Sequence, residues 1–181
     1  TPNAEFAAAP LAHMFLTVRV SNDRTVPRFA ITTDGTKGEQ QIDGKEPLPV
    51  DQWTHIAVTR SGNVGTLFVN GVAVGTNTSM TLRPADLGLT KGNWIGRCQF
   101  PQRNVSYLNA AVDEFQIFDR ALTPAEVQSL TTSPAGSTGG GNVAWYRFDE
   151  TGGPGAADAS GKSRDARIIA PTDGRRHPGF L

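Results

Sequence analysis

Residues 53–75, WTHIAVTRSGNVGTLFVNGVAVG, decide the fold class of this chain. The stretch contains three short apolar runs, and Asn70-Gly71 separates the last two. An Asn-Gly pair in this position predicts a β-hairpin with a type I′ turn, because both central residues of that turn need positive φ. The turn also sets the pairs that face each other across the hairpin: Val69 with Val72, Phe68 with Ala73, and Leu67 with Val74.

The rest of the chain repeats this pattern of short alternating runs separated by Gly, Asn, Asp and Pro, which is typical of an all-β sandwich. One short helix is expected after Thr123, since Thr123 can cap it, Pro124 suits its first position and Glu126 completes a capping box. The expected strands are 15–20, 29–33, 53–60, 66–69, 72–75, 94–97, 112–118, 143–148 and 166–169.

Composition and charge exclude several functional classes. The 181 residues include 17 Lys and Arg and 17 Asp and Glu, so no net charge attracts nucleic acid or an anionic membrane. No apolar run is long enough to span a bilayer. Cys98 is the only cysteine, which excludes an internal disulfide and any multi-cysteine metal site. We interpret Cys98 as a structural strand residue.

Three segments carry a family resemblance: the hairpin region 53–75, NWIGRCQF (93–100) and AVDEFQIFDRALTPAEVQSL (111–130). Together they resemble the laminin-G-like, concanavalin-A-like jelly-roll modules of secreted bacterial glycan-active proteins of the actinobacterial type. The resemblance implies an antiparallel concanavalin-A-like β-sandwich with one short helix, in an extracellular module of a larger protein.

The order of the segments divides the chain into three parts. Residues 1–130 are the main body, and 131–142, TTSPAGSTGGGN, read as a flexible linker. Residues 143–181 resemble the opening strands of the same or a second module. Because these last residues are too few to bury a core alone, we expect 143–148 to pair with 112–118, within the chain or between chains. A permuted sandwich, an excerpt of two tandem modules and a swapped strand all remain open.

Similar modules often carry a structural calcium ion between their first and last strands, and calcium prefers carboxylate and carbonyl oxygens. Strand alternation places Asp113 on the more apolar face of 111–118, where a carboxylate needs a cation or several donors. The resemblance therefore implies a calcium site formed by Asp113, Asp149, Asp158 and Asp165. The alternative is that Asp113 accepts backbone amide hydrogen bonds or pairs with an arginine.

Catalysis by these acidic residues is not expected. Glycoside hydrolysis needs two carboxylates across a cleft, and related glucanases carry a Glu-x-Asp-x-x-Glu strand that VDEFQIF lacks. The adjacent pairs Asp113-Glu114 and Asp149-Glu150 point to opposite faces of a strand.

Carbohydrate binding is the better prediction, because aromatic rings stack on the flat C–H faces of sugars. Trp53, Trp94 and Trp145 lie in strand-like segments, where core packing is the simpler interpretation. Loop 100–109 is the first choice for a binding site, since loops carry function on rigid sandwiches. The predicted carbohydrate-binding residues are Trp94, Gln102, Arg103, Asn104 and Tyr107.

The sequence thus predicts a non-catalytic carbohydrate-binding or scaffold module of a secreted multidomain glycoside hydrolase. Its partners would be a polysaccharide and the catalytic domain of the parent enzyme. A protein-interaction or adhesion module that packs against an enzyme core is the alternative, and a glycoside hydrolase in its own right is the third hypothesis.

Overall fold

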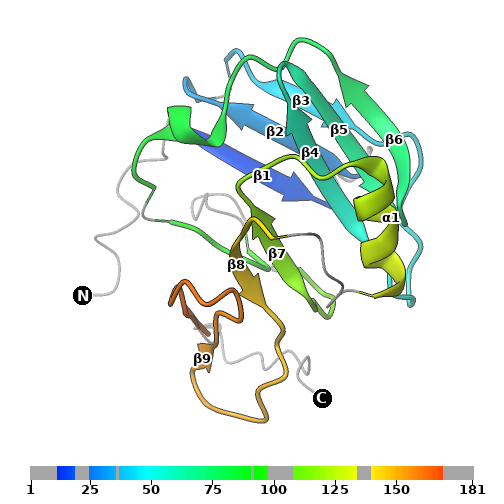
Figure 1. The fold of residues 1–181 in the computed structure, drawn as a ribbon. Helices are drawn as coiled ribbons and strands as arrows, with labels where there is room; N and C mark the ends of the chain where they lie inside the picture. The colour runs from blue at the N-terminus through cyan, green and yellow to red at the C-terminus, as the bar shows by residue number, and fades with distance from the viewer. Residues whose placement is uncertain are drawn as a thin grey trace. The chain divides into compact units, whose positions relative to one another are not determined.

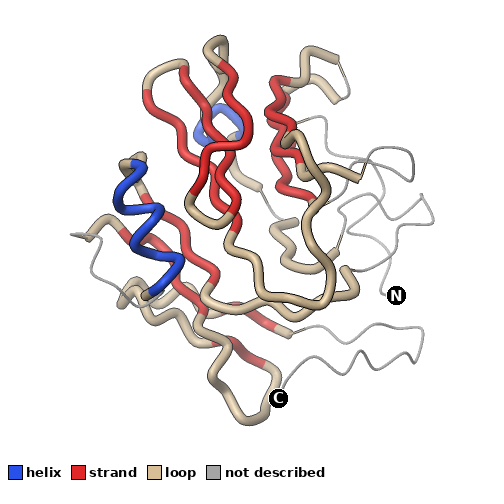
Figure 2. The backbone as a smooth tube through the Cα atoms, turned by 90° about the vertical axis from the view of Figure 1, so that its right-hand side faces the viewer, coloured by secondary structure: helices blue, strands red, loops and turns tan. Residues whose placement is uncertain are grey.

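A computed structural model describes residues 12–18, 25–35, 37–90, 92–97, 108–133 and 140–168. The chain divides into two compact units, one formed by 1–93 and 120–136 and the other by 94–119 and 137–181. Strands are the main regular elements of the described residues, with α1 as their α-helix (Figures 1 and 2). The predicted all-β fold class is confirmed.

The first unit contains two antiparallel three-stranded sheets, with strand orders β1-β2-β3 and β4-β5-β6. The strand bounds are β1 His13–Thr17, β2 Arg28–Thr32, β3 Gln40–Asp43, β4 Ile56–Ser61, β5 Val64–Val69 and β6 Val72–Asn77. The sequence did not predict β3, because QQID offers a single aliphatic side chain to the core.

The core of this unit lies between the two sheets. Ile31 and Ile42 from the first sheet and Leu67 from the second are at most 2% exposed and pack together with Met80. Burial of side chains of this size stabilises the fold by about 1.5–3 kcal/mol each. The backbones approach closely at Gly75, where a Cβ atom would overlap the Asp43 carbonyl oxygen. The two sheets therefore pack face to face as a sandwich.

The hairpin of β5 and β6 confirms the predicted turn. Asn70 and Gly71 have φ angles of 48° and 78°, as a type I′ turn requires. Val69 pairs with Val72 and Phe68 with Ala73, but Leu67 pairs with Gly75 rather than with Val74. The predicted Leu67–Val74 pair is wrong because a β-bulge inserts one extra residue at this point.

Helix α1 (Pro124–Thr132) also begins as predicted. Thr123 accepts a hydrogen bond from the Glu126 amide, and the Glu126 side chain accepts one from the Thr123 amide. Val127 and Leu130 are buried, and the helix packs so close to Gly71 that a Cβ there would overlap Gln128. A short 3-10 helix, η2 (Pro84–Leu87), lies after β6.

The second unit is built on the antiparallel pair of β7 (Phe115–Phe118) and β8 (Asn142–Tyr146). The predicted pairing of 112–118 with 143–148 is confirmed for Phe115–Phe118 with Asn142–Tyr146, and it occurs within one chain. Two short strands, β9 (Gly155–Ala156) and β10 (Ala166–Arg167), form a second antiparallel pair. The predicted strand at 94–97 is wrong: these residues bend, because Gly96 takes a φ of 80° that extended backbone excludes.

Candidate functional site

The two-stranded ribbon of β7 and β8 has faces of opposite character. Gln116 lies directly opposite Trp145, while Phe115 lies opposite Tyr146 and Ile117 opposite Ala144. Because side chains alternate along a strand, Phe115, Ile117, Ala144 and Tyr146 share one face, and Gln116 and Phe118 share the other with Trp145. Three more polar side chains contact Trp145 or Gln116 on that second side: Glu114, Asn142 and Arg147. We call the group of Glu114, Gln116, Asn142, Trp145 and Arg147 the Trp145 face.

A network of polar contacts fixes the side chains of the Trp145 face. The Trp145 indole Nε1–H donates a 2.5 Å hydrogen bond to Glu114 Oε2. Arg147 lies 3.7 Å from Glu114 Oε1 and 2.9 Å from Asp149 Oδ2, and its guanidinium is 5.6 Å from the centre of the Trp145 ring. The Asn142 side-chain amide donates to Gln116 Oε1 at 3.3 Å. The half-buried indole ring is therefore held in one orientation.

Glu114 occupies an unusual backbone position at the start of β7. Its φ of 51° lies in the left-handed region, which costs a residue with a Cβ about 1–2 kcal/mol. Its carboxylate compensates through the contacts with Trp145 and Arg147. The turn also breaks strand alternation, so Asp113 is exposed and accepts a hydrogen bond from the Glu114 amide. The predicted apolar environment of Asp113 is therefore wrong.

The opposite face anchors the ribbon within its unit. The rings of Phe115 and Tyr146 stack with centroids 6.1 Å apart, and the Tyr146 hydroxyl donates to the Arg164 carbonyl at 2.7 Å. Burial, followed by the charges of Asp158 and Asp165, raises the pKa of Tyr146, so its hydroxyl stays protonated as a donor.

Asp158 ties β8 to the turn that follows it. Its carboxylate accepts backbone hydrogen bonds from Trp145 at 2.9 Å, Ser160 at 2.9 Å and Arg164 at 3.0 Å. The Ser160 side chain and these amides together lower the pKa of Asp158, against the effect of desolvation. The turn that begins at Asp158 thus supports the strand that carries Trp145.

The arrangement of the Trp145 face suits recognition of a saccharide. An oriented indole offers an apolar surface for sugar C–H groups. A carboxylate and side-chain amides, such as those of Glu114, Gln116 and Asn142, accept and donate the hydrogen bonds that sugar hydroxyls form. From the sequence alone, Trp145 is predicted to pack in the core and Glu114 is not predicted to belong to a site. Aligning the two strands, which brings Glu114 and Arg147 together, would have identified both.

The predicted binding loop is described only in part. Gln102, Arg103, Asn104 and Tyr107 lie outside the described residues, as does Cys98. Trp94 is half-buried, and the Arg97 guanidinium lies 4.4 Å from the centre of its ring. The Leu108 amide donates to the Gly96 carbonyl at 2.9 Å, which closes the base of this loop.

The four aspartates predicted to bind calcium have other partners in the described structure. Asp149 pairs with Arg147, Asp158 accepts three backbone amides, and Asp165 accepts the Asp158 amide at 2.9 Å. Among the described residues, no three His, Cys, Asp or Glu side chains are grouped to hold a metal ion. These residues do not fit a ready-made calcium site, so calcium binding stays a prediction.

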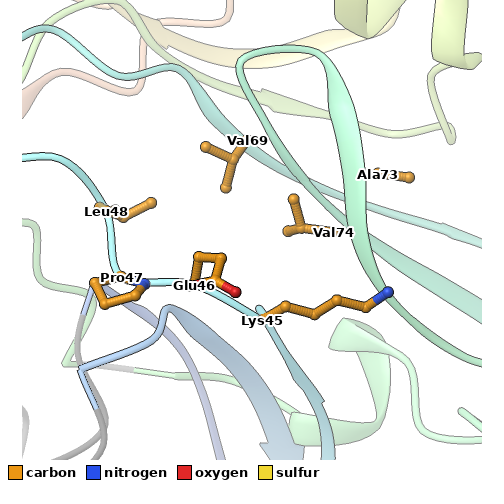
Figure 3. Close-up of a pocket in the computed structure, with 7 residues that line it drawn as sticks. All are labelled: Lys45, Glu46, Pro47, Leu48, Val69, Ala73 and Val74. Carbon is orange, nitrogen blue, oxygen red and sulfur yellow. The ribbon is translucent and has the colours of Figure 1, made fainter.

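A separate apolar groove lies in the first unit (Figure 3). It has a volume of about 260 Å³ and is lined by Lys45, Glu46, Pro47, Leu48, Val69, Ala73 and Val74. Trp53 in the same unit is 71% exposed and Val72 is 62% exposed. The predicted core packing of Trp53 is wrong, because β4 begins only at Ile56 and leaves Trp53 in the preceding loop.

Two antiparallel sheets packed face to face over one core define a concanavalin A-like β-sandwich. The chain belongs to the laminin-G-like family of the concanavalin A-like lectin/glucanases superfamily, whose model matches residues 7–128. The matched region ends within α1, before β8 begins.

Two solved structures are similar to this chain. A protein from Bacteroides ovatus ATCC 8483, to which carbohydrate binding is provisionally ascribed, is 20% identical, with a TM-score of 0.57, over 87% of this chain and 47% of that one. An S-layer domain-containing protein (residues 221–444) from Clostridium thermocellum ATCC 27405 is 36% identical, with a TM-score of 0.42, over 69% and 58%. This chain therefore spans about half the length of these structures.

None of the curated proteins compared with this sequence is a significant match. Within the described part of the chain, no helix has the length and apolar character needed to cross a membrane.

Proposed function

We propose that this chain is a non-catalytic carbohydrate-binding module and that the Trp145 face binds the saccharide. The observation that carries the proposal is the fixed orientation of the Trp145 indole, whose Nε1–H donates a 2.5 Å hydrogen bond to Glu114 Oε2. A separate, apolar face of the same ribbon packs within the unit. Membership of a lectin and glucanase superfamily supports the same function. The Bacteroides ovatus protein, to which carbohydrate binding is provisionally ascribed, shares only the fold with this chain, and that shared fold is consistent with the proposal.

The module would act by proximity. Sugar binding at a single face is weak, but it holds any linked domain near its polysaccharide and so raises the local concentration of that domain. A secreted parent protein with a glycoside hydrolase domain is the context that the family resemblance suggests. This wider context is part of the proposal.

Affinity electrophoresis in gels that contain neutral polysaccharides tests the proposal. The wild-type chain should be retarded by at least one of mixed-linkage β-glucan, xylan, mannan and hydroxyethylcellulose. Glu114→Gln keeps the size of the side chain but weakens the acceptor for the Trp145 indole, and it should reduce the retardation. Trp53→Ala, which removes an exposed tryptophan of the first unit, is the matched control and should leave the retardation unchanged.

A specific observation favours a second candidate, a protein-interaction module. Val50, Trp53 and Val72 are 80%, 71% and 62% exposed, and they would form an interaction surface if they belong to one apolar patch. On this account the first unit would pack against another domain of the parent protein. Co-elution of this chain with the other domains, lost in Val72→Glu, would support it, and failure to co-elute would count against it.

A further inference from the structure

Resting on the proposed function, we infer that the Trp145 face selects glycans that bring hydrogen-bond donors and no negative charge. The ligands would be neutral polysaccharides or amino-bearing ones such as chitosan. Glycans with uronate or sulfate groups would bind more weakly. Three features of the described residues carry the inference.

The first feature is the local charge. Asp113, Glu114 and Asp149 each carry a carboxylate and Arg147 carries the positive charge among them, so these four residues have a formal net charge of −2. All of them lie at the end of the ribbon where β7 begins and β8 ends. Within a Debye length, about 10 Å at 0.1 M salt, this charge repels an anionic sugar.

The second feature is the state of Arg147. An arginine that recognises a uronate or sulfate presents its guanidinium as a fork to the anion. Arg147 instead has Asp149 Oδ2 at 2.9 Å and Glu114 Oε1 at 3.7 Å. An anionic group that reaches this guanidinium would therefore lie beside two carboxylates that already partly neutralise it, whereas a neutral ligand leaves both ion pairs intact.

The third feature is the balance of donors and acceptors. The Trp145 indole N–H is already donated to Glu114, and one of the two N–H groups of the Asn142 side-chain amide is donated to Gln116. The Glu114 carboxylate still has lone pairs, because each oxygen can accept more than one hydrogen bond. The face therefore offers acceptors, which suit sugar hydroxyl or ammonium donors.

Two further charges beside β8 offset each other. The Arg164 guanidinium binds the carbonyl of Val143, two residues from Trp145, and the Asp158 carboxylate accepts the Trp145 amide at 2.9 Å. Glu150 adds a further negative charge, although its carboxylate accepts the Ala157 amide at 2.7 Å.

The test uses ligands that share a backbone and differ in charge. Neutral hydroxyethylcellulose and anionic carboxymethylcellulose form one pair, and neutral chitin and amino-bearing chitosan oligomers form the other. Any further neutral polysaccharide that binds is compared with its own carboxymethyl derivative. We expect carboxymethylcellulose, or the carboxymethyl derivative of another glycan that binds, to bind at least about threefold more weakly than its neutral parent at 20 mM salt, with the difference shrinking at 0.5 M salt. Chitosan oligomers should bind at least as tightly as chitin oligomers. This factor is what Coulomb's law in water gives for one unit charge on the protein and one on the ligand roughly 6 Å apart, because their interaction changes the dissociation constant by about threefold.

Asp149→Asn is the diagnostic variant, since its side chain is 66% exposed and its removal should leave packing intact. It should raise binding of the anionic derivative by about threefold and leave binding of the neutral parent unchanged. Asp119→Asn removes one exposed carboxylate from the other end of β7 and should change neither. Equal or tighter binding of the anionic derivative by the wild-type chain would overturn the inference while leaving the proposed function standing. If no neutral or amino-bearing glycan binds, the proposed function fails and the inference fails with it.

Discussion

Replacing Gly75 by alanine tests the packing of the two sheets in the first unit. A Cβ atom at this position would overlap the Asp43 carbonyl oxygen and lie 3.0 Å from Ile42 Cγ2. The overlap is with backbone, so no rotamer change relieves it and the sheets must separate locally. Overpacking of this kind costs about 3 kcal/mol at the upper end of its range, and the lower entropy of the unfolded alanine chain recovers about 0.4–1 kcal/mol. The net loss is about 2 kcal/mol, or roughly 4–8 °C in melting temperature for a chain of this size.

Alanine substitutions at two further glycines serve as controls for the effect of Gly75→Ala on the melting temperature. Gly65→Ala would overlap the Met80 sulfur, which sits near the end of a flexible side chain, so it should cost less than Gly75→Ala. A Cβ atom at Gly152 would have no neighbouring atom within 4 Å, and the φ of Gly152 is not left-handed, so Gly152→Ala should leave stability unchanged or slightly raised. Thermal unfolding followed by circular dichroism compares the three variants. Equal melting temperatures for Gly75→Ala and Gly152→Ala would refute the face-to-face packing at this point.

Three other predictions concern protonation, the turn after β8 and calcium. Hydrogen bonds from Arg120 and then Thr123 lower the pKa of Glu126 from 4.5 to about 2, so its stabilisation is complete above pH 4.5 and disappears as the pH falls towards 2. Melting temperatures from pH 2 to 6 should therefore fall more steeply for the wild type than for Glu126→Gln, and parallel curves would contradict this. Asp158→Ala removes the acceptor of three backbone amides and should lower the melting temperature more than Asp165→Ala, which removes the acceptor of one. If the four predicted aspartates bind calcium, a chelator lowers the calorimetric melting temperature, and an unchanged value removes the metal from the account.

Local chemistry made much of the fold predictable. Asn70-Gly71 requires a type I′ turn, and Thr123 with Glu126 forms a capping box, so both elements follow from residues close in sequence. The pairing of β7 with β8 also followed from the sequence, because an unpaired apolar strand is unstable.

What the sequence left unpredicted depends on single backbone angles and on contacts between distant segments. The bulge beside Leu67 and the left-handed φ of Glu114 each shift alternation by one residue, and no residue type marks either position. Trp53 was expected in the core because no Gly, Pro, Asn or Asp separates it from β4, so the sequence does not mark Ile56 as the first strand residue. The role of Trp145 depends on Glu114, 31 residues away in sequence, and requires the register of the two strands.

The measurement that tests the central claim most directly is polysaccharide binding by Trp145→Ala beside Trp53→Ala. Both variants lose a tryptophan, and circular dichroism of each establishes that it is folded. Removing the ring of the Trp145 face should weaken binding by about tenfold or more, which corresponds to about 1.4 kcal/mol, while Trp53→Ala should bind like the wild type. A folded Trp145→Ala variant that binds polysaccharide as tightly as the wild type would contradict the account.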